Sequence, residues 1–182
     1  LKTSGATYSV VDRIEIESRI EQIKDLFPNT KLPSVYLLHG EFTDEEMNEI
    51  YNHPKVKAMV SFTKGEGFGR PLLEFSLVNK PIIASGWSGH LDFLQPNCVG
   101  LCGGSINNVD KSAQVKGLII EGSQWFDIDH KFIDGFYNDV YDNYEGWLER
   151  AKNQGKHSKT NFSFDKMTEK ISELFDKNLK EL

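Results

Sequence analysis

Short apolar runs alternate with helical patterns in the first half of the chain. The runs are bounded by glycine, proline or polar residues, as buried strands usually are. They cover residues 35–38, 56–62, 81–85 and 99–102. Because buried strands that alternate with helices are typical of a parallel sheet covered on both faces, the pattern predicts an α/β fold with a parallel sheet flanked by helices.

Two capping sequences predict the helices before and after the first of these runs. Asp12 and Thr43 are each followed three residues later by glutamate, which is the order of a capping box. Apolar residues then recur at helical spacing until Pro28 and Pro54 end the two helices. Residues 1–5 have the pattern of a strand tail that enters a turn, so we expect an N-terminally truncated domain.

The last part of the chain has a different pattern. Residues 103–122 are rich in Gly, Ser and Asn and predict an irregular loop. A long aromatic helix is predicted from Asp129, then a polar break at 155–163 and a last helix from about Asp165. Each helix has one apolar face, which predicts packing in a core. The two faces consist of Phe132, Phe136, Val140, Tyr144 and Trp147, and of Met167, Ile171, Leu174, Phe175 and Leu179.

Composition narrows the class of protein. The 182 residues include 21 Lys and Arg against 27 Asp and Glu, which gives a formal net charge of −6. This length can bury the core of one domain, which we expect to span residues 1–182 with the helices of residues 129–182 packing on it. The acidic balance argues against nucleic-acid binding, which uses a basic surface. The apolar share of 38% argues against disorder.

Targeting and cysteine patterns predict a cytoplasmic protein. No run of 18 apolar residues is present and the N-terminus lacks the pattern of a signal peptide, so neither a membrane span nor secretion is predicted. Cys98 and Cys102 are too few for a disulfide scaffold and have no second Cys or His pair nearby, so zinc binding is not expected. We expect two small buried thiols in a reducing compartment.

The stretch with the clearest chemistry is residues 66–74. Here a glycine-rich turn ends a strand and opens a helix. The first helical turn has free N–H groups, and the helix dipole adds about half a positive charge. Gly67 and Gly69 leave the backbone approachable, so a diphosphate could bind there. Taken alone, a tight turn made for packing is at least as good an explanation.

Two glutamates make the interpretation more specific. Glu66 lies in the turn, and Glu74 lies near the second helical turn with its side chain leaning back toward the N-terminus. Carboxylates repel phosphate, but they accept hydrogen bonds from vicinal hydroxyls. The arrangement therefore favours a diphosphate with a ribose on one side and a sugar on the other.

These residues resemble the glycosyltransferase group 1 family. The resemblance is carried by residues 66–74 (E-G-F-G-R-P-L-L-E), by residues 80–85 (K-P-I-I-A-S) and by Gly89. The family hallmark is Glu-x7-Glu, within E-G-F-G-x-P-x-L-E-A followed by G-K-P-V-I-A-S. The match covers roughly residues 35–103, and the tail from Trp125 is similar to the end of the family. The family has the GT-B fold, with two Rossmann-like domains, and is largely retaining.

The resemblance implies that this chain is most of a C-terminal, Rossmann-like, donor-binding domain of a nucleotide-sugar transferase. Glu74 would bind the ribose, and Glu66 would bind and orient the transferred sugar as the catalytic residue, without becoming a covalent nucleophile. The implied sugar- and diphosphate-binding residues are Glu66, Gly67, Phe68, Gly69, Arg70, Leu72 and Leu73. The implied nucleobase-side residues are Leu38, His39 and Gly40. The donor is a substrate, and neither a cofactor nor a metal is expected.

The sequence departs from the family pattern at several positions. Phe75 stands where alanine is usual, Asn79 where glycine is usual, and Arg70 where an aliphatic residue is common. Arg70 is either a surface residue or an extra contact to the diphosphate. The family's Arg and Lys that neutralise the diphosphate lie upstream of this match, so the chain alone is expected to be inactive. Lys2 is either a substitute for them or a solvated lysine.

Alternatives remain open at this point. His90 either faces the sugar or serves capping and packing, and His39 either neighbours the base or does not. A non-catalytic nucleotide- or sugar-binding module and a nucleotide-sugar epimerase of the same fold are the other functions considered. A glycoside hydrolase is disfavoured because nothing around the two glutamates suggests the apolar burial that raises the pKa of a catalytic acid. The acceptor is a glycan, a lipid or a protein.

Overall fold

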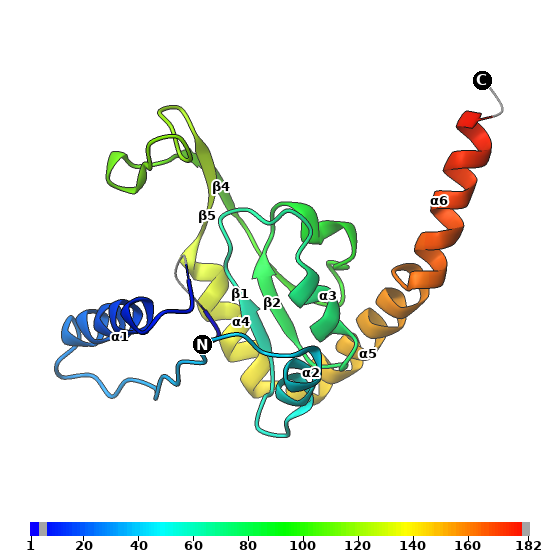
Figure 1. The fold of residues 1–182 in the computed structure, drawn as a ribbon. Coiled ribbons are helices and arrows are strands. Elements are labelled where there is room, and N and C mark those ends of the chain that lie inside the picture. The colour runs from blue at the N-terminus through cyan, green and yellow to red at the C-terminus, as the bar shows by residue number, and fades with distance from the viewer. Residues whose placement is uncertain (4–6, 180–182) are drawn as a thin grey trace. The chain divides into compact units, whose positions relative to one another are not determined.

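The computed structural model describes residues 1–3 and 7–179 (Figure 1). The chain divides into two compact units, Leu1–Ile50 and Tyr51–Leu182. The strand tail expected at residues 1–5 falls partly on residues 4 and 5, which lie outside the described residues.

The N-terminal unit begins with helix α1 (Val10–Asp25). The helix was expected to start at Asp12, but Ser9 is the N-cap, because its hydroxyl accepts a hydrogen bond of 3.1 Å from the Asp12 amide. Asp12 instead accepts hydrogen bonds from Thr7. None of the 16 residues of α1, all of them described, is buried.

The buried strand predicted at residues 35–38 is wrong. The segment makes one parallel bridge, between Lys2 and Leu38, and Val35 and Tyr36 are 44% and 77% exposed. Within the described part of this unit no further strand pairs with the segment. A single bridge leaves most of the backbone without ladder hydrogen bonds, so the apolar pattern alone does not produce a strand.

Helix α2 (Asp44–Asn52) follows, and its predicted capping box is confirmed. The Thr43 amide donates to Glu46 Oε2 at 2.8 Å, and the Glu46 amide donates to Thr43 Oγ1 at 3.2 Å. These two bonds satisfy N–H groups that a helix start otherwise leaves free.

The second unit is built on a parallel sheet (Figure 1). Its strands are β1 (Met59–Ser61), β2 (Ile82–Ser85) and β3 (Gly100–Cys102), in the order β1-β2-β3. Three of the predicted apolar runs are therefore strands, each shorter than predicted. The fold is mixed α/β, with a parallel sheet flanked by helices, as the sequence pattern predicted.

Two short helices connect these strands. Helix α3 (Arg70–Ser76) lies between β1 and β2, and the 3₁₀ helix η1 (Gly89–Asp92) lies between β2 and β3. In the register, Ile83 pairs with Val60 on one side and with Gly100 on the other. Because all three strands are parallel, the loops that enter α3 and η1 leave the same edge of the sheet.

The irregular loop predicted at residues 103–122 is wrong at its start, where a strand forms one arm of a β-hairpin, while most of the rest is the loop of that hairpin. Strand β4 (Gly104–Asn108) pairs antiparallel with β5 (Gln124–Ile128), and the connection includes the 3₁₀ helix η2 (Lys111–Ala113). The Gly, Ser and Asn content of β4 is unfavourable for a strand. The ladder with β5 overrides that preference, because every residue of β4 has a partner.

The single aromatic helix predicted from Asp129 is two helices. Asp129 caps α4 (His130–Asp142), and α5 (Tyr144–Asn161) follows after a break at Asn143, whose φ and ψ are −123° and 46°. The predicted polar break at residues 155–163 is also wrong, because α5 continues through Gly155 to Asn161.

A core forms where α4 and α5 meet the sheet. Its buried residues are Ile83, Cys102, Val140 and Trp147, and the aromatic residues predicted for this face pack around them. Cys98 and Cys102 are buried and free, as predicted. Burial raises the pKa of both thiols.

Helix α6 (Phe164–Leu179) does not pack as predicted. Its N-terminus is capped by the Ser163 hydroxyl, which accepts a hydrogen bond of 3.2 Å from the Lys166 amide. None of its described residues is buried, and the predicted apolar face is exposed, with Leu174 and Phe175 each 60% accessible. No helix in the described ranges is both long enough and apolar enough to cross a bilayer.

Candidate functional site

The candidate site lies beyond the carboxyl ends of β1 and β2. Two loops meet there, residues 62–69 before α3 and residues 86–88 before η1. In open parallel sheets this edge is where ligands usually bind. The two loops are joined by hydrogen bonds that fix the turn carrying Glu66.

The backbone of Glu66 is held from the opposite loop. Its amide donates to Ser88 Oγ at 2.9 Å, while the Ser88 hydroxyl donates to the Glu66 carbonyl at 2.6 Å. The Gly89 amide donates to the same carbonyl at 2.9 Å. Three hydrogen bonds therefore fix the position of this backbone unit, while the Glu66 side chain remains partly exposed.

Close packing explains two of the glycines. A Cβ on Gly89 would overlap the carbonyl oxygen of Gly67, and a Cβ on Gly69 would lie 3.0 Å from His90 Cβ. Gly69 is also the N-cap of α3 with a φ of 88°, which residues with a Cβ rarely adopt. By contrast, a Cβ on Gly67 would meet nothing within 4 Å, so the outer surface of the turn is open.

Four consecutive amides follow Glu66 in this turn, and of their residues 67, 68 and 70 are exposed while Gly69 is buried. The N–H groups of residues 67–70 make no hydrogen bond within the described part of the chain. The amides of Leu72 and Leu73, which the resemblance assigns to the donor, are already engaged, donating to the Gly69 carbonyl at 2.9 and 3.1 Å. An anion at this site would therefore meet the turn itself and not the amides of Leu72 and Leu73.

Glu74 lies on α3 and forms an ion pair with Arg70. The distance from Arg70 Nε to Glu74 Oε1 is 3.0 Å, and the two side chains are 77% and 40% exposed. The exposure of Arg70 agrees with the interpretation as a surface residue. Because Arg70 directly follows Gly69, it is also close enough in the chain to meet an anion at the turn. The pairing contributes little stability because both groups are in contact with water.

The other residues around the turn are apolar or buried. Phe68 packs on Phe93, with ring centroids 5.2 Å apart. His90 is fully buried, and its Nε2 lies 2.6 Å from the Ser85 carbonyl oxygen. His90 Nδ1 and Ser85 Oγ are buried and have no hydrogen-bond partner among the described residues. Burial of His90 favours packing over a direct contact with a sugar.

The departure from the family pattern at Asn79 has a structural explanation. Asn79 has a φ of 57°, in the left-handed region that glycine and asparagine tolerate best.

A Cβ on Gly155 would lie 2.8 Å from the Ser76 carbonyl and would overlap Asn79 Oδ1. Helix α5 therefore approaches α3 closely at this point, and the buried glycine is a packing residue.

The three residues that the resemblance implies on the nucleobase side lie in the N-terminal unit. Leu38 forms the bridge with Lys2, His39 is partly buried with its ring edge-on to Tyr8, and Gly40 has a φ of 132°. Lys2 is exposed, with its ammonium 5.3 Å from the centroid of the Phe42 ring.

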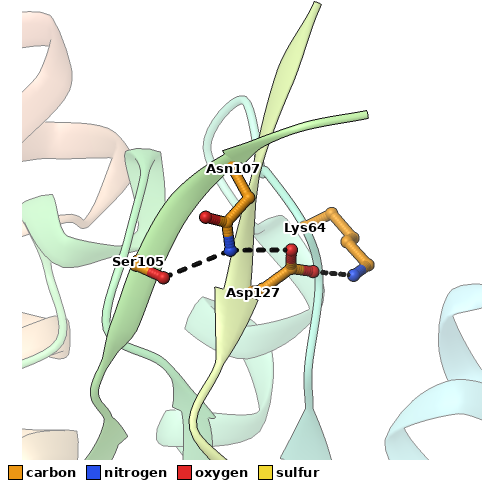
Figure 2. A network of polar contacts seen from close by, with 4 residues as sticks. All are labelled: Lys64, Ser105, Asn107 and Asp127. Atoms are coloured by element: carbon orange, nitrogen blue, oxygen red, sulfur yellow. Dashed lines mark hydrogen bonds and ion pairs between the residues drawn. The ribbon is translucent and has the colours of Figure 1, made fainter. Parts of the chain in front are cut away.

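The hairpin contacts the turn through residues that sequence reasoning missed. The Phe126 amide donates to the Lys64 carbonyl at 3.0 Å, and the Lys64 ammonium pairs with Asp127 and lies 4.4 Å from the centroid of the Trp125 ring. Figure 2 shows Lys64 joined through Asp127 to Asn107 on the neighbouring strand. The hydrogen bonds from Lys64 and then from Asn107 lower the pKa of Asp127.

A second contact comes from the other loop. Trp87 stacks on Phe126, with ring centroids 6.1 Å apart and planes 14° from parallel. The hairpin therefore touches both loops that form the candidate site. Ser88 was also missed, although its place between Trp87 and Gly89 in a turn is a local signal of loop hydrogen bonding.

Side chains that could bind a metal do not gather in one place. Over residues 1–3 and 7–179, no group of three His, Cys, Asp or Glu side chains is placed to hold a metal ion. Comparison of the sequence with protein-family models gives no match, and comparison with curated proteins gives no significant match.

Proposed function

We propose that this chain supplies the donor site of a glycosyltransferase that moves a sugar from a nucleotide-diphosphate sugar to an acceptor with retention of anomeric configuration. The observation that carries the proposal is the turn of residues 66–70, where four free amides lie between Glu66 and Glu74 in the chain. Helix α3 has only seven residues, so the proposal rests on the turn and the two carboxylates and not on the helix dipole.

Each part of the site has a role in this proposal. The free amides bind the diphosphate, and Arg70 adds a positive charge beside it. Glu74 accepts hydrogen bonds from the ribose hydroxyls, exchanging its ion pair with Arg70 for them. Glu66 accepts hydrogen bonds from the sugar hydroxyls and orients the sugar over the leaving diphosphate, which the amides stabilise as charge develops. The resemblance to the group 1 family supports the same assignment.

The chemistry can be written without a covalent enzyme intermediate. The bond from the anomeric carbon to the diphosphate oxygen breaks, and the acceptor hydroxyl attacks the same face of the sugar. The departing phosphate oxygen takes the acceptor's proton. Glu66 stays a carboxylate throughout and acts as a hydrogen-bond acceptor.

Ligand-observed saturation-transfer NMR tests the donor site. UDP, GDP and ADP and their sugar conjugates are titrated into the chain, and we expect one base to bind selectively. Glu74→Ala should weaken that binding at least ten-fold, since a hydrogen bond to a charged group contributes about 1.5–3 kcal/mol.

The matched control is Glu149→Ala. Glu149 is also a helical glutamate in a surface ion pair, 3.2 Å from Lys152, and its removal should leave nucleotide binding unchanged. Binding of none of the nucleotides, or equal binding by both variants, would contradict the proposal. Binding without transfer to any acceptor in the presence of an acceptor domain would instead favour a non-catalytic module.

A further inference from the structure

A second polar groove lies at the foot of the hairpin, where β4 and β5 meet the start of α4. Its volume is about 700 Å³, within the range of small-molecule sites. Gly103 and Gly104 contribute backbone to its wall. The side chains that give the groove its chemistry are Ser105, Asn107, Asp127, Asp129, Lys131 and Phe132.

The charges of this groove are paired. Asp127 pairs with Lys64, and Asp129 Oδ2 lies 2.6 Å from the ammonium of Lys131. The hydrogen bonds from these lysines lower the pKa of each aspartate, so both carboxylates are charged at neutral pH. A small anion or cation would have to break a pair to bind, and a neutral ligand would not.

The same face retains hydrogen-bonding capacity. Asn107 Nδ2 donates to Ser105 Oγ at 3.2 Å and to Asp127 Oδ2 at 3.1 Å (Figure 2). Because the Asp127 carboxylate only accepts hydrogen bonds, the NH₂ group of Asn107 must face it. Asn107 Oδ1 is then an acceptor with no partner in the described part of the chain. The Ser105 hydroxyl accepts from Asn107, and its own proton has no partner within the described residues. An acceptor and a donor side by side match a hydroxyl group that both donates and accepts.

Two apolar residues that pack against the core also line the groove. Phe132 lies directly against the backbone, because a Cβ on Gly103 would be 2.8 Å from its ring. Ile128 adds further apolar surface. A lining that combines hydroxyl and amide groups with an aromatic ring suits a molecule with hydroxyls on its rim and C–H groups on its faces.

We propose that this groove binds a neutral oligosaccharide, with Asn107 and Ser105 as its hydrogen-bonding residues. The groove's link to the Glu66 turn runs through Lys64, which pairs with Asp127 and lies two residues before Glu66. Its assignment as the place where an acceptor glycan is held rests on the function proposed above. The proposal that an oligosaccharide binds here depends only on the residues of the groove.

Indole NMR of the whole chain gives a direct test. The sequence contains three tryptophans, so ¹⁵N-labelling yields three indole signals. Trp125 lies directly across the ladder from Asn107, and Trp147 is buried and donates to Asp139 at 2.9 Å. Titration with maltotriose, cellotriose and mannotriose should move the Trp125 signal saturably for at least one sugar and leave Trp147 in place.

Variants on the two faces of one strand provide the control. Asn107→Ala and Ser105→Ala should each weaken binding of that sugar at least ten-fold. Asn108→Ala, which removes an equally exposed asparagine from the opposite face of β4, should change it less than two-fold. The proposal is overturned if no trisaccharide moves Trp125, if the three variants behave alike, or if inorganic phosphate or Mg²⁺ competes with the sugar for this groove.

The same samples separate this proposal from the donor site. Glu74→Ala should weaken nucleotide binding at least ten-fold and leave trisaccharide binding intact. If a trisaccharide binds and no nucleotide does, the groove is a glycan site and the transferase proposal fails. If a nucleotide binds and no trisaccharide does, only the groove proposal fails.

Discussion

Gln154 on α5 anchors the loop that follows η1. Its side chain is 1% exposed and makes three hydrogen bonds. Its Oε1 accepts from the Gln95 amide at 2.8 Å, and its Nε2 donates to the Phe93 carbonyl at 2.8 Å and to Ser158 Oγ at 3.0 Å. The Ser158 hydroxyl in turn lies 2.8 Å from that of Ser76 on α3 and donates to it, because Ser76 donates its own proton to the Leu73 carbonyl. One amide therefore joins α5 to the segment behind the candidate site.

Gln154→Met removes these hydrogen bonds while keeping the length and helix propensity of the side chain. Ser158 keeps its bond to Ser76, so the Phe93 carbonyl and the Gln95 amide are the groups left without a partner. Two such groups cost about 2–6 kcal/mol, and burial of the methionine side chain returns about 1.5–3 kcal/mol. The loss of the hydrogen bonds outweighs the gain from burial, and we expect a net destabilisation of about 2 kcal/mol.

Urea unfolding at 25 °C, followed by tryptophan fluorescence, measures this difference. With a slope of about 2 kcal/mol/M, the midpoint should fall by about 1 M. Asn153→Met changes the exposed neighbour on the same helix and should stay within about 0.5 kcal/mol of the wild type. If the free energy of unfolding of Gln154→Met is also within about 0.5 kcal/mol of the wild type, the three hydrogen bonds do not stabilise the fold by the expected amount.

Two further predictions concern the turn and the hairpin. Gly89→Ala forces its Cβ onto the Gly67 carbonyl, so nucleotide affinity measured by NMR should fall at least ten-fold. Gly65→Ala adds a Cβ that meets nothing within 4 Å and should retain the affinity. Equal affinities of the two variants would show that the overlap at residue 89 is relieved without moving the turn. The hydrogen bond from Lys64 lowers the pKa of Asp127 from its ordinary value of 3.8. The contribution of the Asp127 carboxylate to stability is therefore complete above pH 3.8 and is lost as the pH falls through its lower pKa in the folded protein. A carboxyl NMR titration in which Asp127 titrates at or above 3.8, or in which Lys64→Met fails to raise its pKa, would contradict the ion pair.

The elements that the sequence predicted correctly are those with local causes. The strand at Ile82–Ser85 is an apolar run between proline and glycine, and Thr43 reaches Glu46 within one helical turn. The glycine turn after β1 also follows from a local pattern. These features depend on neighbours within a few residues, so a single sequence contains the information.

The elements that the sequence predicted wrongly have distant causes. Strand β4 exists because β5 pairs with it, and residue 155 in the middle of α5 is a glycine because α3 lies against it at Ser76. The break at Asn143 divides a continuous apolar face whose periodicity predicts one helix. At the candidate site, Glu66 and Glu74 could be identified from spacing, whereas the bond from Lys64 to Asp127 spans 63 residues and has no local signal.

The same separation between Lys64 and Asp127 has a consequence for biosynthesis. Chains are made at about 5–20 residues per second, so the partner of Lys64 emerges about 3–13 s after it, given their separation of 63 positions in the chain. During that interval the sheet edge at β1 and β2 can form while the turn above it lacks the amide of Phe126 and the carboxylate of Asp127. The nascent chain thus passes through a stage in which both loops of the candidate site are present but the hairpin that contacts them is not complete. A chaperone or a ligand present at that stage would meet an open turn.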